Sequence, residues 1–538
     1  MNATRPVSED RSWFSAWPGH LPHHLEYPLV SATWILERTV DRFPDRTAVI
    51  FVDHESLGEI CSLTYRELWT RSCSLAAGIR RLGVNKGDRV AVILPNSPAM
   101  IIAYYGIWLA GAAIAPCNVL ASEKEIEFQV DNCGARLLIA ADALAPSAAG
   151  VAEKFRIPLV AADVDGGATD RPEAAISFEE LTHSGEASPE DVEVDPRKDM
   201  AVLLYTGGTT GEPKGAELTH TNIVANTIQF AEWYAFEPGE ETCICTIPMS
   251  HSGGMSGVMN VPLYAGATLV VMKRFRPESV TKSIENYRAT RFFGVPTMYV
   301  SILNCEESEG HDLSSLKACR TNAAPLPASV KEAFDRFAGK EVLIEGYGLT
   351  EASPLTHANP PERAKPGSIG IPLPDTDAKV IDLRTGEDVP VGSEGELVLR
   401  GPQLMKAYWG NPEATAKAME GGWFHTGDVA KMDDDGYFYI VDRLKDMINS
   451  GGYKVWPRDV EEVLYSHPQL QMAVVIGVPD DYYGETVKAC IVPKEEVRGK
   501  MTAEEIIAFC KARMSSYKAP RIVEFRDSLP ISPQGKVL

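Results

Sequence analysis

At 538 residues the chain is longer than one hydrophobic core usually supports, so two or more domains are expected. Its apolar content of 44% and charged content of 23% are ordinary for a globular protein, whereas a formal net charge of −22 argues against a surface that coats nucleic acid. Any anionic ligand must therefore be met by local positive groups. The ten cysteines show no recurring metal-ligand spacing, which indicates reduced thiols in a cytoplasm-like compartment.

The first part of the chain alternates helical patterns with short apolar strands. Residues 1–10 are polar and predict no secretory signal. Segment 98–120 carries no charge, but its glycines and proline favour a buried helix followed by a strand over a membrane span. Thr64 and Glu67 have the spacing of a capping box at the start of a helix. The alternation indicates βαβ units and an α/β fold with largely parallel sheets.

A glycine-rich stretch, Y-T-G-G-T-T-G-E-P-K-G at 205–215, follows an apolar run at 200–204. Glycines let backbone N–H groups approach a ligand, while threonine hydroxyls and a lysine ammonium can bind phosphate oxygens. The stretch is not a Walker A loop, because Lys214 follows Pro213 and precedes Gly215. On its own it is equally typical of an ordinary surface loop, so the rest of the chain decides its role.

A second polar turn follows the strand predicted at 342–345 and reads G-Y-G-L-T-E-A-S-P at 346–354. Ligands of parallel α/β folds gather at the carboxyl ends of the strands. This turn and the glycine-rich loop both lie at such ends. They are therefore expected to contribute to one ligand site.

Beyond about residue 366 short strands with turn signals predict a small antiparallel, barrel-like subdomain. A charged stretch at 442–446 then precedes a compact αβ tail. We place a domain boundary at Asp442, which divides the chain into an N-terminal domain of residues 1–441 and a C-terminal domain of residues 442–538. The predicted architecture is α/β, with layered αβ subdomains in the large domain and an α+β fold in the small one.

Taken together, six ordered motifs resemble the adenylate-forming superfamily of acyl-CoA synthetases, luciferases and peptide-synthetase adenylation domains. They are the glycine-rich loop, P-M-S-H-S-G-G-M at 248–255, G-Y-G-L-T-E-A-S-P at 346–354, W-F-H-T-G-D at 423–428, D-R-L-K-D through S-G-G-Y-K at 442–454, and S-P-Q-G-K at 532–536. The resemblance implies two steps: a carboxylate attacks the α-phosphorus of Mg-ATP to give an acyl-adenylate and pyrophosphate, and then the thiol of coenzyme A displaces AMP. Because the first step brings two anions together, fixed donors and positive charge are required.

The resemblance also implies which residues bind the nucleotide. The set is Thr206, Gly207, Gly208, Thr209, Thr210, Lys214, Ala323, Ala324, Pro325, Gly346, Tyr347, Gly348, Asp428 and Arg443. The loop residues would hold the β- and γ-phosphates, and Glu351 resembles the family's Mg²⁺ ligand, with Thr350 beside it at the α-phosphate. Tyr347 would stack on adenine. Asp428 would accept from the ribose hydroxyls, and Arg443 would donate to the ribose or the phosphate.

The C-terminal domain is implied to carry the catalytic lysine. Lys536 matches the family lysine that reaches the substrate carboxylate and α-phosphate; the chain ends two residues later, sooner than in most members, which we interpret as a trimmed tail. Asp442 stands at the hinge about which the small, mobile domain rotates between the half-reactions. Gly451, Gly452 and Tyr453 would then approach the pantetheine of CoA.

The resemblance also places the acyl pocket. Its implied residues are His251, Ser252, Met255, Asn322, Gly348 and Ser353. His251 resembles the family's gate residue and is counted as catalytic with Lys536, Glu351 and Thr350. Asn322 stands where relatives commonly carry glycine, and it would narrow the pocket or hydrogen-bond a distal polar group. The 346–354 motif resembles that of fatty acyl-CoA synthetases, which favours a medium- or long-chain fatty acid.

Other acids and acceptors stay open at this stage. An aryl-CoA ligase of the coumarate type and an acyl-AMP ligase that loads a carrier protein are the alternatives, and a luciferase-type oxygenase shares the motifs. The expected ligands are ATP, Mg²⁺, CoA and a small carboxylic acid, with no nucleic acid. We expect a cytoplasmic monomer or homodimer without a transmembrane segment, and peripheral membrane contact stays open.

Overall fold

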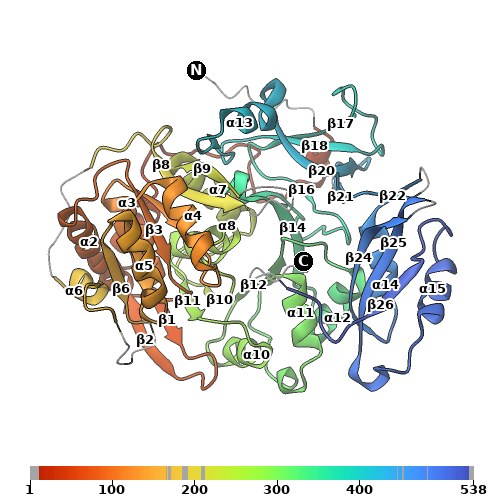
Figure 1. Cartoon of the computed structure of the whole chain (residues 1–538), viewed down its shortest axis with the longest axis horizontal. Helices are drawn as coiled ribbons and strands as arrows, with labels where there is room; N and C mark the ends of the chain where they lie inside the picture. The colour runs from red at the N-terminus through yellow and green to blue at the C-terminus, as the bar shows by residue number, and fades with distance from the viewer. Residues whose placement is uncertain are drawn as a thin grey trace.

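The computed structural model describes residues 11–164, 167, 171–184, 192–206, 213–444, 446–450, 453–480 and 483–531. Within these residues the strands form sheets of nine, eight, five and four strands (Figure 1). The two largest sheets carry long runs of parallel strands. The α/β fold with largely parallel sheets is thus confirmed.

The eight-stranded sheet comes mainly from the N-terminal part of the chain. Its order is β19 (Ala407–Tyr408), β9 (Lys214–Thr219), β8 (Met200–Thr206), β4 (Ala113–Pro116), β3 (Arg89–Ile93), β5 (Ala135–Ala141), β6 (Leu159–Ala162) and β7 (Ile176–Ser177). The helices of this part are α2 (Tyr65–Arg81), α3 (Pro98–Leu109), α4 (Glu123–Cys133), α5 (Ala145–Phe155) and α6 (Phe178–Thr182). Strands β4, β3, β5 and β6 pair in parallel, whereas β8 and β9 form the antiparallel hairpin that flanks the glycine-rich loop.

The nine-stranded sheet carries the second polar turn. Its order is β16 (Ile371–Pro372), β15 (Leu355–Ala358), β14 (Leu343–Gly348), β13 (Ala318–Thr321), β12 (Arg291–Gly294), β10 (Thr242–Cys245), β11 (Thr268–Met272), β1 (Thr47–Val52) and β2 (Glu59–Thr64). Its helices are α1 (Trp34–Arg42), α7 (His220–Trp233), α8 (Ser252–Gly254), the π-helix η3 (Met255–Asn260), α9 (Val261–Tyr264), α10 (Pro277–Asn286), α11 (Pro296–Leu303) and α12 (Ala328–Ala338). Strand β10 ends at Cys245, although the mostly apolar sequence continues to Met249.

The last third of the chain forms two smaller sheets. The four-stranded sheet is antiparallel and contains β17 (Asp377–Ile381), β18 (Gly395–Arg400), β20 (Phe424–Met432) and β21 (Phe438–Arg443), with α13 (Pro412–Ala418) nearby in sequence. The five-stranded sheet contains β23 (Tyr453–Val455), β22 (Ile448–Ser450), β25 (Gly484–Pro493), β24 (Leu470–Asp480) and β26 (Ile522–Phe525), with helices α14 (Pro457–Tyr465) and α15 (Ala503–Lys511). Figure 1 shows this C-terminal sheet and its helices in blue at one side of the molecule.

Local sequence signals account for several of these elements. The capping box at the start of α2 is present, with Thr64 and Glu67 bonding each other's backbone N–H groups. The uncharged segment 98–120 forms the buried helix α3 and the buried strand β4, as predicted. No helix within the described ranges is long and apolar enough to cross a membrane. All ten cysteines are free thiols, and eight of them are buried.

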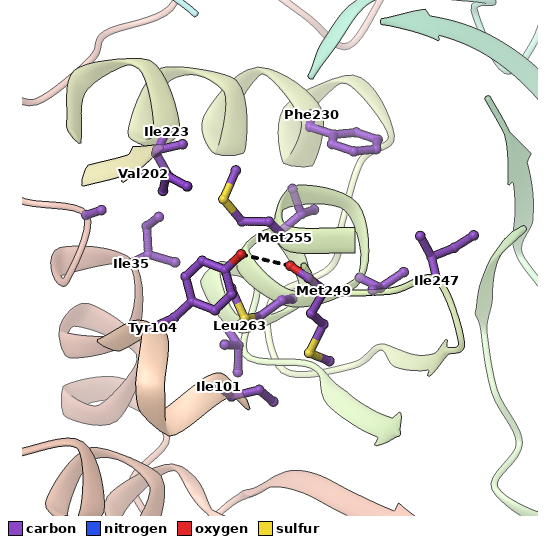
Figure 2. Packing of buried hydrophobic residues seen from close by; sticks show 14 of the residues in the cluster. Ile35, Ile101, Tyr104, Val202, Ile223, Phe230, Ile247, Met249, Met255 and Leu263 are labelled. Atoms are coloured by element: carbon purple, nitrogen blue, oxygen red, sulfur yellow. Dashed lines mark hydrogen bonds between the residues drawn. The ribbon is translucent and has the colours of Figure 1, made fainter. Parts of the chain in front are cut away.

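Helix α3 also fixes the segment that precedes the predicted gate residue. Tyr104 is fully buried, and its hydroxyl donates a 2.8 Å hydrogen bond to the Met249 carbonyl, as Figure 2 shows. Met249 and Met255 are themselves completely buried in the same apolar cluster. The turn that contains His251 is therefore anchored at both ends by the core.

A buried histidine joins the N-terminal arm to α7. His220 begins α7, is 1% exposed, and accepts a 3.0 Å hydrogen bond from the Ala32 N–H at Nδ1. Burial lowers its pKa to about 4. The unfolded chain therefore binds a proton at this residue at a pH where the folded chain does not, and stability falls as pH falls through this window.

We expect His220→Asn to flatten this pH dependence. Between the unfolded and the folded pKa of His220, the wild type loses about 3 kcal/mol of its free energy of unfolding through this residue. Urea-denaturation midpoints measured from neutral to acidic pH would show a smaller fall for the variant than for the wild type. His183→Asn, at an exposed position, is the control. Equal falls in all three proteins would contradict the prediction.

Candidate active site

The first part of the site joins three strands from the second half of the chain. Tyr347 lies on β14, and Asp428 on β20 faces Arg443 on β21 in register. The Tyr347 hydroxyl donates a short hydrogen bond to Asp428 Oδ2, and Asp428 Oδ1 lies 3.5 Å from Arg443 Nε. Burial, and then the Asp428 charge, raise the pKa of Tyr347, so its phenol stays protonated. This arrangement presents an oriented carboxylate suited to hydroxyl donors.

The second part joins the ends of the glycine-rich loop to the second polar turn. Thr206 and Lys214 pair across the β8–β9 hairpin, where Thr206 Oγ1 donates to the Lys214 carbonyl at 3.3 Å. Lys214 Nζ lies 5.2 Å from the ring centroid of Tyr408 on β19. The Tyr408 hydroxyl in turn donates a 2.8 Å hydrogen bond to Glu351 Oε1. The Lys214 ammonium, the Tyr408 ring and the Glu351 carboxylate therefore follow one another between the β8–β9 hairpin and the second polar turn.

The two parts are connected by a single short segment. Tyr347 is the last residue but one of its strand, and Glu351 lies in the short 3₁₀ helix Thr350–Ala352 that follows. A nucleotide placed along this segment would meet a hydroxyl acceptor at one end and a hard carboxylate with a neighbouring ammonium at the other. The acceptor carboxylate fits the hydroxyls of a ribose. The second carboxylate and its neighbouring ammonium fit a metal-bound polyphosphate.

The predicted acyl residues come together from three segments. Ser252, Met255 and Ser353 are buried, and the hydroxyl of Ser256, next to Met255, donates a 2.5 Å hydrogen bond to the Ser353 carbonyl. Asn322 follows β13 and is 9% exposed; its Nδ2 would lie 3.3 Å from a Cβ placed on Gly346. His251 precedes α8, where its carbonyl accepts the Met255 N–H at 2.7 Å.

The remaining nucleotide residues lie on neighbouring turns. Ala323 has a left-handed φ of +76° in the exposed turn after β13, and Ala324 and Pro325 follow it there. Gly348 faces the chain that returns towards β15, since a Cβ on it would lie 2.2 Å from the Pro354 carbonyl oxygen. Backbone contact of this closeness explains why only glycine fits at Gly348.

Tyr453 and Asp442 are the described residues among the C-terminal candidates, and they make contacts of their own. Tyr453 is 59% exposed and stacks on Tyr517 with ring centroids 4.8 Å apart. Asp442 lies within β21 and accepts the backbone N–H of Arg458 at 3.1 Å. Several predicted residues fall outside the described part of the chain, namely Gly207, Gly208, Thr209, Thr210, Gly451, Gly452 and Lys536. Their assigned roles stay predictions, as does the domain boundary.

Sequence reasoning missed Tyr408. Its neighbours in the K-A-Y-W-G stretch carry no pattern that indicates a ligand site. Its importance arises because β19 pairs with β9, which sets Tyr408 opposite Ala216. Pairing across such a separation is not encoded in local periodicity.

Comparison with known proteins identifies the chain's relatives. A model of the AMP-binding enzyme family matches residues 36–409, and a model of the AMP-binding enzyme C-terminal domain matches residues 459–536. The chain belongs to the AMP-binding enzyme family. The predicted resemblance to the adenylate-forming superfamily is thereby confirmed.

The individual relatives are CoA ligases or CoA synthases. The chain is 40% identical over 555 residues to a long-chain-fatty-acid–CoA ligase of Bacillus subtilis, across 99% of this chain and 97% of that protein. It is 37% identical over 482 residues to a feruloyl-CoA synthase of an Amycolatopsis species, across 89% and 92%. The solved anthranilate CoA ligase AuaEII in complex with anthranoyl-AMP has a TM-score of 0.85 and 27% identity, across 95% and 96%. This family member is an AMP-forming acyl-CoA synthetase.

We predict that Tyr408→Phe impairs adenylation without unfolding the protein. The change keeps the ring beside Lys214 but removes the hydroxyl that holds Glu351, and a hydrogen bond to a charged group contributes about 1.5–3 kcal/mol. Pyrophosphate release should fall by at least about tenfold, and the Mg²⁺ concentration for half-maximal rate should rise. Tyr439→Phe removes a comparable hydroxyl–carboxylate bond, to Asp433 at 3.0 Å, and is the control. Equal rates in both variants would contradict the positioning role.

Proposed function

We propose that this acyl-CoA synthetase activates a medium- or long-chain fatty acid and transfers the acyl group to CoA. The observation that carries the nucleotide half is a pair of contact groups, Arg443–Asp428–Tyr347 and Glu351–Tyr408–Lys214, which the short segment 347–351 joins along the chain. The acid class is supported by the full-length similarity to the long-chain-fatty-acid–CoA ligase. The buried, largely uncharged lining around Met255 is consistent with an alkyl chain.

In this proposal each end of the nucleotide has its own residues. Asp428 accepts from the ribose hydroxyls, and Tyr347 presents its ring to adenine while its hydroxyl orients Asp428. Thr206 and Lys214 meet the β- and γ-phosphates. A Mg²⁺ ion held by Glu351 would offset phosphate charge, and the Tyr408 hydroxyl keeps that carboxylate in place.

In this proposal the C-terminal domain acts in both half-reactions. During adenylation Lys536 stabilises the charge that develops, and the domain then rotates about Asp442 for the second half-reaction. Gly451, Gly452 and Tyr453 line the path of the CoA pantetheine after the rotation. The exposure of Tyr453, at 59%, leaves its ring accessible to a partner surface.

An aromatic acid is the second candidate, because the chain is also 37% identical to a feruloyl-CoA synthase. A pyrophosphate-release screen separates the two classes. It would combine a length series of saturated fatty acids with benzoic and phenylpropenoic acids, each with and without CoA. Turnover confined to aryl acids would overturn the fatty-acid proposal, and thioester transfer that requires a carrier protein would overturn CoA as the acceptor.

We expect Lys536→Ala to separate the half-reactions. Removing a charge that acts only on the adenylation transition state should lower pyrophosphate release by about 10²–10³-fold. Thioester formation from preformed acyl-AMP and CoA should be largely retained. Lys518→Ala removes another C-terminal lysine, which pairs with Asp459 at 2.6 Å, and serves as the control. Equal losses in both half-reactions would contradict the assignment of Lys536.

A further inference from the structure

A buried arginine lies beside the acyl residues and has no role in the nucleotide site. Arg320 is on β13, two residues before Asn322, and is 2% exposed. Arginine is rarely buried to this degree without a charged partner. Within the described residues Arg320 forms no ion pair, whereas Arg291 on the neighbouring strand pairs with Glu241 at 2.9 Å.

Aromatic rings, not carboxylates, surround the guanidinium. Its Cζ lies 4.4–5.5 Å from four ring centroids, contributed by Phe230, Tyr234, Phe236 and Phe293. Cation–π contact offsets part of the cost of burial. It does not satisfy the in-plane N–H groups, which need oxygen acceptors.

Most of the Arg320 N–H groups lack a hydrogen-bond acceptor in the described part of the chain. Nη2 donates to the Gly257 carbonyl at a long 3.5 Å. Nε and Nη1 are buried without any acceptor in the described part of the chain. Burial lowers the pKa of Arg320, and so does the charge of Arg291. An anion at this point would therefore be attracted by two cations and would complete the missing hydrogen bonds.

Arg320 lies close to two of the segments that carry the predicted acyl residues. Asn322 and Gly346 lie near the carboxyl ends of their strands, where the nucleotide residues gather, whereas Arg320 precedes Asn322 on β13. The Gly257 carbonyl that it contacts belongs to η3, the π-helix that begins at Met255. π-Helical segments recur at functional sites. Arg320 therefore contacts the same π-helix that carries Met255, one of the predicted acyl residues.

We propose that Arg320 recognises a second carboxylate at the distal end of the acid, so that the favoured substrate is an aliphatic dicarboxylic acid. The inference rests on the proposed function, since it assumes that the acid lies between η3 and β13. A carboxylate can accept two parallel N–H bonds from one guanidinium, either from Nη1 and Nη2 or from Nε and Nη2, so one of the two unpartnered nitrogens takes part in either geometry. A methyl terminus at the same point would leave the buried charge unpaired.

The test compares matched acids on the wild-type enzyme. Monocarboxylic and α,ω-dicarboxylic acids of equal carbon number would be assayed for pyrophosphate release over a length series. At the best length the diacid should have a kcat/KM at least about tenfold above its methyl-terminated match, because a site built for a polar group rejects the analogue that lacks it. This comparison needs no variant, so it holds even if substitutions at Arg320 impair folding.

Variants then assign the preference to the guanidinium. Arg320→Met should lower kcat/KM for the diacid by about 100-fold while the monoacid rate is kept or raised and the KM for ATP is unchanged. For Arg320→Lys the kcat/KM for the diacid should lie between the values of the wild type and Arg320→Met, because lysine keeps the charge but loses the two parallel N–H donors. Arg288→Met removes an exposed arginine paired with Asp312 at 2.7 Å and is the matched control.

The outcomes separate the two levels of the proposal. A wild-type preference for methyl-terminated acids at every length would overturn this inference alone and leave the fatty-acid function in place. Equal loss of both substrates in Arg320→Met, with a lower unfolding temperature, would assign Arg320 a purely structural role and also overturn it. Turnover of neither aliphatic series would overturn the proposed acid class together with this inference.

Discussion

The geometry of the site depends on how the segment between β14 and β15 is held. Asn226 of α7 bonds both backbone groups of Leu355, at 2.8 and 3.2 Å. The Ser353 hydroxyl donates to the Gln403 carbonyl at 2.9 Å, and the Met405 N–H donates to the Glu351 carbonyl at 2.7 Å. Helix α7 and segment 403–405 thus fix the turn from two sides. Because Glu351 lies on this turn and Tyr347 lies on the strand just before it, one set of buried hydrogen bonds orients both ends of the nucleotide site.

The same anchoring explains how three sheets serve one site. The turn belongs to the nine-stranded sheet, Lys214 and Tyr408 belong to the eight-stranded sheet, and Asp428 belongs to the four-stranded sheet. Each sheet alone places only part of the polar set at its edge. Segment 403–408 joins the turn to the eight-stranded sheet, since it contacts the turn through Met405 and continues into β19, and the Tyr347–Asp428 bond joins the four-stranded sheet. The ligand site is therefore a property of the packed sheets, not of any one βαβ unit.

Much of the fold could be predicted from the sequence because its signals are local. The capping box at Thr64, the buried helix and strand within 98–120 and the antiparallel texture after residue 366 each depend on neighbours a few positions apart. The polar motifs likewise indicated Tyr347, Glu351, Asp428 and Lys214 as members of one site, and the structure brings these four together in two contact groups.

The missed features depend on contacts between distant parts of the chain. Tyr408 meets Glu351 across 57 positions, and Arg320 meets Phe230 across three strands and several helices. An isolated tyrosine or arginine in the sequence gives no sign of its burial or its partner. The early end of β10 at Cys245 has a similar origin, because residues 246–251 turn away to meet α3 through Met249.

Few contacts hold the proposed hinge, which fits its assigned role. The Asp442 carboxylate accepts the N–H of Arg458 at 3.1 Å, at the start of α14, and Arg458 also donates to the backbone carbonyls of Ile440 and Gly367. Burial raises the pKa of Asp442, so the charge that favours this helix start is itself costly to keep. A net contribution of about 1 kcal/mol for a typical hydrogen bond makes the total small beside the stability of either domain. The proposed rotation about Asp442 would break only these bonds at the hinge itself, and the differential affinity of a ligand for the two arrangements could offset a cost of this size.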